Sequence, residues 1–125
     1  MKKIISTDNA PAAIGPYSQA VEAAGLIFIS GQLPIDPATG AMAPAEIKAQ
    51  TEGVIKNLES ILKSQGLTLE NILKTTVYMA DLSQFAQMNE VYAKFFSNNP
   101  PARATIEVKA LPKAALVEIE AIAAR

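Results

Sequence analysis

Residues 18–31, SQAVEAAGLIFISG, determine the expected fold, because they predict two strands joined by a tight turn. The turn falls at Ala24-Gly25, where glycine can adopt the backbone conformations that tight turns need. The second strand begins with Leu26-Ile27-Phe28-Ile29, an uninterrupted apolar run that predicts burial on both faces of a sheet. Such a sheet needs a covering layer on each face.

The rest of the chain predicts a sheet covered by two helices. Residues 45–65 carry apolar side chains three and four positions apart, from Ile47 to Leu62, as in a helix packed on one side. The order βββαβαββ predicts an α+β fold with both helices on one face of one sheet, in a single domain of residues 1–125. The second helix is expected at 84–97, with Phe85, Met88, Tyr92, Phe95 and Phe96 buried, and further strands at 3–6, 72–80, 103–109 and 115–122.

Two helices leave one face of this sheet without cover. Strand 115–122 nevertheless has apolar residues on both faces, with Leu116 and Ile122 on one and Val117 and Ile119 on the other. Since no third helix is predicted, a second copy of the chain is the simplest cover, and we expect a homo-oligomer. The alternative is a mildly apolar face that stays open to water.

The composition limits the chemistry that the chain can perform. It has no Cys and no His, which excludes disulfides, thiolate nucleophiles and the commonest transition-metal ligand. The 11 basic and 12 acidic residues are scattered and give a net charge of −1, so nucleic acid and anionic membranes are not expected partners. MKKIISTDNA lacks the apolar run of a signal peptide, and no run approaches the ~20 residues of a membrane span. These features fit a cytoplasmic protein.

Arg103 is the charged residue at the head of a strand in NPPARATIEV, residues 99–108. Alternation places Arg103, Thr105 and Glu107 on one face of that strand. A charge that enters a sheet needs a partner or water. The side chain either reaches water at the strand end or pairs with Glu107 nearby, or with Glu118 or Glu120 farther on. The other possibility is a ligand carboxylate or phosphate, which the fork of guanidinium donors would fit.

Two carboxylates, Glu118 and Glu120, share a face of strand 115–122 with Leu116 and Ile122. This pattern fits an exposed face with two incidental apolar residues. It equally fits the edge of a cleft, where one carboxylate could position or activate a water molecule. The residue types therefore support a site for a small anion with one carboxylate that handles water.

Two short segments add candidate site residues. Ser30-Gly31 closes the most apolar strand, where a glycine would let a ligand approach the backbone, with N–H groups free to donate. An ordinary strand end explains the same residues. Gly15-Pro16-Tyr17 is a rigid turn that directs the Tyr17 ring either outward or into the core.

Several segments resemble the RidA family, also called YjgF, whose members are reactive-intermediate deaminases. They are APAAIGPYSQAV, FISGQLPIDPATG, LKTTVYMADLSQFAQMNEVYAKFF, PPARATIEVKALP and VEIEAIA, and the resemblance covers nearly the whole chain. It implies a chorismate-mutase-like fold and a homotrimer with clefts between neighbouring subunits. The implied activity protects against metabolite damage: hydrolysis of 2-imino acids (2-iminobutanoate, 2-iminopropanoate) or their enamines to 2-oxo acids and ammonia. No cofactor or metal is implied.

The resemblance also implies roles for individual residues. Arg103 matches the arginine that clamps the substrate carboxylate, and Glu118 matches the glutamate that helps to hold the attacking water, although Glu120 stays an alternative. Thr105 stands where many members have Cys; the implied role is mainly backbone hydrogen bonding, and any thiol-dependent step is excluded. The residues that match the lining of the cleft are Tyr17, Ser30, Gly31 and Asn89.

Two other functions stay open at this point. Some family members are described as endoribonucleases or translation inhibitors, but a net charge of −1 and the lack of His do not favour RNA cleavage. The second alternative is a non-catalytic binding or regulatory trimer that uses the same cleft for small carboxylates, such as 2-oxo acids or amino acids. The match at both Arg103 and Glu118 favours turnover.

Overall fold

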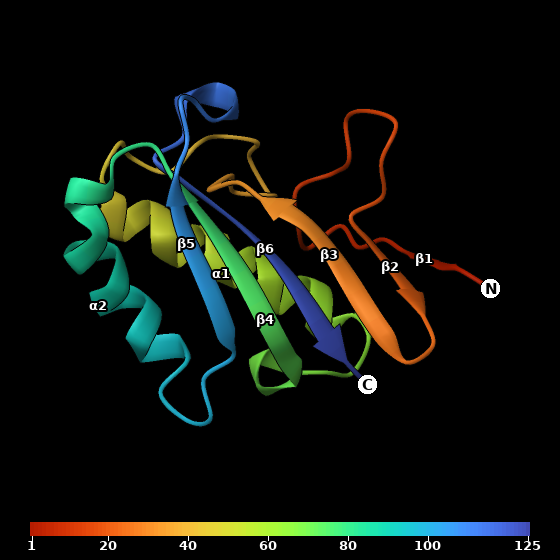
Figure 1. Ribbon diagram of the computed structural model, residues 1–125. Coiled ribbons are helices and arrows are strands. Elements are labelled where there is room, and N and C mark those ends of the chain that lie inside the picture. Colours follow the sequence, from red (N-terminus) through yellow and green to blue (C-terminus); the bar gives the residue numbers. More distant parts are fainter.

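A six-stranded mixed sheet with two helices on one face makes up the computed structural model, which describes residues 1–125 (Figure 1). The strand order is β1-β2-β3-β6-β4-β5; β4 and β5 are parallel and all other neighbours are antiparallel. The expected order βββαβαββ is confirmed. The elements are β1 (Lys3–Ile5), β2 (Ala20–Ala23), β3 (Leu26–Gln32), α1 (Ile47–Lys63), β4 (Ile72–Met79), α2 (Phe85–Phe95), β5 (Ala102–Glu107) and β6 (Val117–Ala124).

The stripe of α1 packs into the core as its spacing predicts. Val54, Ile55 and Leu58 are fully buried, in one cluster with Val77 of β4 and Ile119 of β6. Burying each such side chain contributes about 1.5–3 kcal/mol relative to leaving it exposed. Neither α1 nor α2 is long and apolar enough to span a membrane.

Element ends differ by a few residues from the expected ones. A short 3₁₀ turn at Leu82–Gln84 precedes α2, and Phe96 already leaves the helical conformation with φ −122° and ψ 44°. A second 3₁₀ turn, Pro112–Ala114, delays the start of β6 to Val117. The late starts of α2 and β6 each follow a single turn of 3₁₀ helix, which commonly joins longer elements.

Within one chain, the face of the sheet opposite the helices is open, so the chain itself does not supply the second cover that the apolar run of β3 predicts. Ile27 and Ile29 are buried under the helices, but Phe28 between them is 43% exposed. Ile106 of β5 is 45% exposed on the same face. An uninterrupted apolar run therefore does not mean burial on both sides within one chain. We call this surface the open face; it includes Val21, Phe28, Ile106, Glu118, Glu120 and Ile122.

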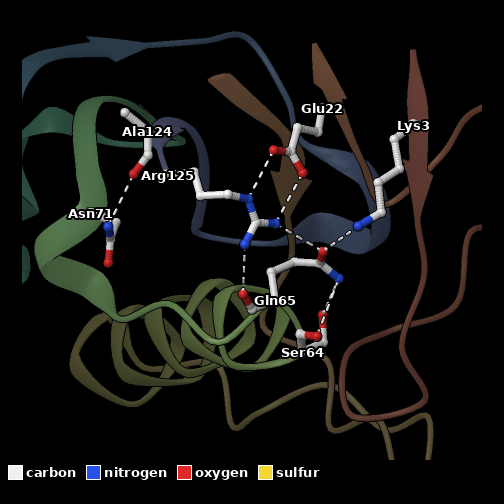
Figure 2. A network of polar contacts seen from close by, with 7 residues as sticks. All are labelled: Lys3, Glu22, Ser64, Gln65, Asn71, Ala124 and Arg125. Atoms are coloured by element: carbon white, nitrogen blue, oxygen red, sulfur yellow. Dashed lines mark hydrogen bonds and ion pairs between the residues drawn. The ribbon is translucent and has the colours of Figure 1, made fainter. Parts of the chain in front are cut away.

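The last residue of the chain is held by a polar network at the Leu26 end of β3 (Figure 2). Both Nε and Nη2 of Arg125 donate to the Glu22 carboxylate, at 2.9 and 3.0 Å. Arg125 also donates to the backbone oxygen and to Oε1 of Gln65, and Lys3 Nζ donates to the same Oε1 at 3.2 Å. These hydrogen bonds hold the pKa of Glu22 below its usual value and tie β2 to the end of α1.

Candidate functional site

A groove of about 650 Å³ lies at the other end of β3, near Gln32. Its walls are the segment before β2 and the turn before β6, and β3 and β6 form its floor. Nowhere do three or more acidic side chains gather in a way that could hold a metal ion. Four residues expected in the site, Tyr17, Ser30, Gly31 and Glu118, line this groove together.

Gly31 makes room for the side chain of Glu118. A Cβ atom built at position 31 would collide with Glu118 Oε2 and lie 2.9 Å from its Cδ. A glycine is therefore needed here for close approach of a carboxylate, and close approach of a ligand to the same backbone stays a prediction. Burial raises the pKa of Glu118, and the neighbouring charge of Glu120 raises this pKa further. A carboxylate with a raised pKa is a stronger base than an exposed one.

Ser30 holds the chain rather than presenting free donors. Its hydroxyl donates to the backbone oxygen of Ser18 at 2.6 Å, and its N–H donates to the backbone oxygen of Gln19 at 2.9 Å. The expectation that this N–H is free to donate to a ligand is therefore wrong. Tyr17, by contrast, is 52% exposed, which fits the outward direction expected from the rigid turn.

Arg103 and Asn89 meet on the helix side of the sheet. Arg103 pairs in register with Thr75 of β4, which is fully buried beneath the helices. Its Nη1 donates to Asn89 Oδ1 at 2.7 Å, and its guanidinium carbon lies 4.7 Å from the centre of the Tyr92 ring and 5.4 Å from that of Phe85. Two aromatic faces and one amide therefore orient the guanidinium.

Within one chain, Arg103 pairs neither with Glu107 nor with any other carboxylate. Glu107 Oε1 accepts instead from the backbone N–H of Leu82 at 2.9 Å, and no carboxylate forms an ion pair with Arg103. On the same strand, Thr105 Oγ1 is buried and has no hydrogen-bond partner. Arg103 therefore has no carboxylate partner within the chain and keeps guanidinium donors beyond the one used by Asn89, and Thr105 Oγ1 is a buried polar atom without a partner.

The structure separates Arg103 from Glu118. Arg103 lies opposite Thr75 of β4, and Glu118 lies opposite Tyr78. Since Thr75 and Tyr78 are three residues apart on one strand, they point to opposite faces of the sheet. The expected site residues thus form two separate groups, here called half-sites. The groove half-site is Tyr17, Ser30, Gly31 and Glu118, and the arginine half-site is Asn89, Arg103 and Thr105.

Sequence reasoning missed the aromatic neighbours of Arg103 and the residue that anchors the groove wall. Phe85 was expected in the core but is 36% exposed beside Arg103. The signal was present, because Phe85, Asn89 and Tyr92 are spaced by four and three residues and so share one helix face. The sequence contains no pattern that marks Gln19, because the hydrogen-bond partners of its side chain are backbone groups.

Comparison with known proteins places the chain in a family. The Endoribonuclease L-PSP family model matches residues 7–125. The chain is 52% identical to the RutC family protein PH0854 of Pyrococcus horikoshii, over 98% of each chain. It is 48% identical to the 2-iminobutanoate/2-iminopropanoate deaminase of Mus musculus, over 98% of this chain and 91% of that protein.

Solved structures give the same result. The YjgF gene product of E. coli has a TM-score of 0.94 at 46% identity, covering 98% of each chain. E. coli TdcF with bound serine has a TM-score of 0.94 at 44% identity, also covering 98% of each chain. With this match over nearly its whole length, the chain belongs to the RidA (YjgF, L-PSP) family.

Proposed function

We propose that the protein hydrolyses 2-iminobutanoate, 2-iminopropanoate and their enamine tautomers to 2-oxo acids and ammonia, and so removes reactive metabolites. The observation that carries this proposal is the oriented guanidinium of Arg103, which no carboxylate of its own chain neutralises. The mouse relative that is 48% identical has this activity in its name. The relative crystallised with serine supports a small amino-acid-like ligand.

The chemistry needs one anion clamp and one oriented water. The guanidinium of Arg103 would hold the substrate carboxylate through two parallel hydrogen bonds. Glu118 would accept a proton from water as its oxygen attacks the imine carbon, and the π electrons of the C=N bond move to nitrogen. Return of that proton to nitrogen gives a carbinolamine. Transfer of its hydroxyl proton to nitrogen, as the C=O bond forms and the C–N bond breaks, then leaves the 2-oxo acid and ammonia. An imine carbon is already electrophilic, so positioning is the main requirement.

We further propose that each complete site forms between two copies of the chain, in a homotrimer. Arg103 and Glu118 lie on opposite faces of one sheet, so no single chain can place both against one small substrate. In a closed ring of three copies, the arginine half-site of each copy would face the groove half-site of the next. Apolar residues on the open face, such as Phe28 and Ile106, support its burial against another copy.

The charge of the chain does not favour RNA cleavage, the activity named in the family description. RNA binding depends on neutralising phosphates with basic side chains. This chain has a net charge of −1, and the basic side chains of the groove and the arginine half-site are two, Lys113 and Arg103. Small carboxylates fit this charge pattern better than a polyanion does.

A direct assay tests the proposed activity. A threonine dehydratase generates 2-iminobutanoate in situ, and the formation of 2-oxobutanoate is followed with and without the protein. We expect a rate that rises above the spontaneous rate in proportion to protein concentration. A folded protein that binds 2-oxobutanoate but leaves the spontaneous rate unchanged would instead be a regulatory carboxylate-binding protein.

Replacing Gly31 with alanine tests whether the position of Glu118 matters. The new methyl group would collide with the end of the flexible Glu118 side chain, so the carboxylate should move while the backbone stays in place. We expect kcat/KM to fall by about tenfold or more, since misplacement by roughly 1 Å can cost that much. The change in Tm should be small.

Gly53→Ala is the matched control for this variant. Its Cβ would lie 3.7 Å from Pro34 Cα, an ordinary contact distance, and Gly53 lies inside α1. Alanine there should stabilise the helix by about 0.5–1 kcal/mol and leave kcat/KM unchanged. If Gly31→Ala is as active as Gly53→Ala, the location of the Glu118 carboxylate does not matter for the reaction.

A further inference from the structure

One wall of the groove has almost no backbone hydrogen bonds of its own. Residues 7–17, here called the wall segment, supply Pro11, Ile14 and Tyr17 to the groove. They contain neither helix nor strand, and their one backbone–backbone hydrogen bond joins Tyr17 N–H to Gly15 O at 2.8 Å. Ile14 is 82% exposed. A segment of this kind needs an anchor from elsewhere in the molecule to keep one position.

The side chain of Gln19 supplies that anchor. It is 4% exposed, and its Nε2 donates to the backbone oxygens of Thr7 (3.0 Å), Ala10 (3.3 Å) and Pro11 (2.8 Å). Its Oε1 accepts from the N–H of Thr7 at 2.7 Å. Among side chains, a neutral primary amide provides two donors and an acceptor at one point. All four contacts go to the wall segment, so one residue fixes its first half.

The backbone of Gln19 connects this anchor to the floor of the groove. Its carbonyl accepts from Ser30 N–H, and the Ser30 hydroxyl holds Ser18 next to it. Gly31 follows directly and lies under the Glu118 carboxylate. The first half of the wall segment is therefore linked by hydrogen bonds through Gln19 to Ser30, and the next residue, Gly31, lies under the Glu118 carboxylate.

We propose that Gln19 is a positioning residue: its amide sets the position of the first half of the wall segment, which brings Pro11 to the groove, relative to β3 and Glu118, and thereby the affinity of the groove for its substrate. The kinetic part of this inference rests on the proposed imine hydrolysis, whereas the anchoring part does not. Gln19 does not act on the reacting atoms, because both its amide nitrogen and its amide oxygen already form hydrogen bonds with the wall segment.

The test uses Gln19→Met, which keeps the length of the side chain but forms none of the four hydrogen bonds. Hydrogen exchange should become about tenfold faster for the amides of residues 7–17, because the segment opens more often. In the 2-iminobutanoate assay, KM should rise by about tenfold while kcat stays within about threefold, as expected when binding geometry and not the chemical group is lost. Gln19→Asn, too short to reach all four partners, should give smaller changes in the same direction and serves if the Met variant does not fold.

Gln65→Met is the matched control, because Gln65 also accepts side-chain hydrogen bonds but belongs to the network at the far end of β3 (Figure 2). It should lower Tm without changing KM or exchange in residues 7–17. If both Gln19 variants show the hydrogen exchange and the KM of the wild-type protein, the proposal is wrong. It is also wrong if exchange in residues 7–17 becomes faster while KM stays unchanged.

If wild-type protein shows no imine hydrolysis, the proposed function fails, and the Kd for 2-oxobutanoate replaces KM in the comparison. Should the wild type also fail to bind that acid, the exchange of residues 7–17 decides the anchoring role alone. Faster exchange in Gln19→Met than in Gln65→Met would then support it, and equal exchange would refute it.

Discussion

Arg103→Ala is expected to lower kcat/KM for 2-iminobutanoate by about 10²–10³-fold, since a charged hydrogen-bond partner of a ligand contributes a few kcal/mol. The wild-type guanidinium is already oriented by Asn89 Oδ1 and by the rings of Phe85 and Tyr92. It therefore needs little reorganisation before it binds a carboxylate. Steady-state kinetics across substrate concentrations measure the loss, most of which should appear in KM.

Two variants control for side effects of removing Arg103. Arg103→Lys keeps the charge but should still lose much of the activity, because an ammonium cannot form the two-pronged hydrogen bond or stack in the same way on Tyr92. Arg125→Ala removes another arginine, one that is paired with Glu22 (Figure 2), and should lower Tm without affecting kcat/KM. An Arg103→Ala protein that is folded, assembled and fully active would refute the clamp.

Glu118→Gln is expected to lower kcat by about 10²–10³-fold, which lies within the roughly 10²–10⁴-fold that a general base typically contributes. Glutamine has the same shape as glutamate, so the groove and its affinity for 2-oxobutanoate should be retained. Calorimetric binding of that acid and the turnover assay measure the two quantities separately. Full activity in this variant would mean that another group accepts the proton from water, with Glu120 as the first candidate.

The pH dependence of activity offers an independent check on Glu118. Burial, and secondarily the charge of Glu120, raise its pKa. Glu118 accepts a proton only when ionised, so activity should fall as the pH drops through this raised pKa. Glu120→Gln removes the secondary cause and should shift this acidic limb to lower pH, while activity near neutral pH is retained. An unchanged profile in Glu120→Gln would mean that another group controls the limb.

The sequence was sufficient for the arrangement of the elements but not for the relation between the half-sites. The spacing of Val54, Ile55 and Leu58 predicted the buried side of α1, because helical periodicity depends on local sequence alone. Alternation along β5 also placed Arg103 and Thr105 together. Whether Glu118 of β6 lies on the same face of the sheet as Arg103 of β5 depends on how each of these strands pairs with β4. This register is a property of the folded sheet.

Features that depend on tertiary contacts were not accessible from the sequence. Phe28 shows this, because its apolar neighbours suggested burial on both sides, yet one chain leaves it partly exposed. Gly31 and Gln19 show it in another way. Position 31 needs a glycine because a carboxylate from β6 lies against it, and the side chain of Gln19 forms hydrogen bonds with four backbone groups of the wall segment. The homotrimer stays a prediction, as do the catalytic roles of Arg103 and Glu118.

Mixing two inactive variants tests most directly whether each site uses residues from two copies of the chain. Arg103→Ala and Glu118→Gln proteins are unfolded together, refolded as mixed oligomers and assayed with 2-iminobutanoate, and native mass spectrometry verifies the mixing. With random assembly in a closed ring, about a quarter of the sites should combine an intact Arg103 with an intact Glu118 from the neighbouring copy, giving about a quarter of wild-type activity. Mixed oligomers no more active than the average of their parents would contradict the two-chain site.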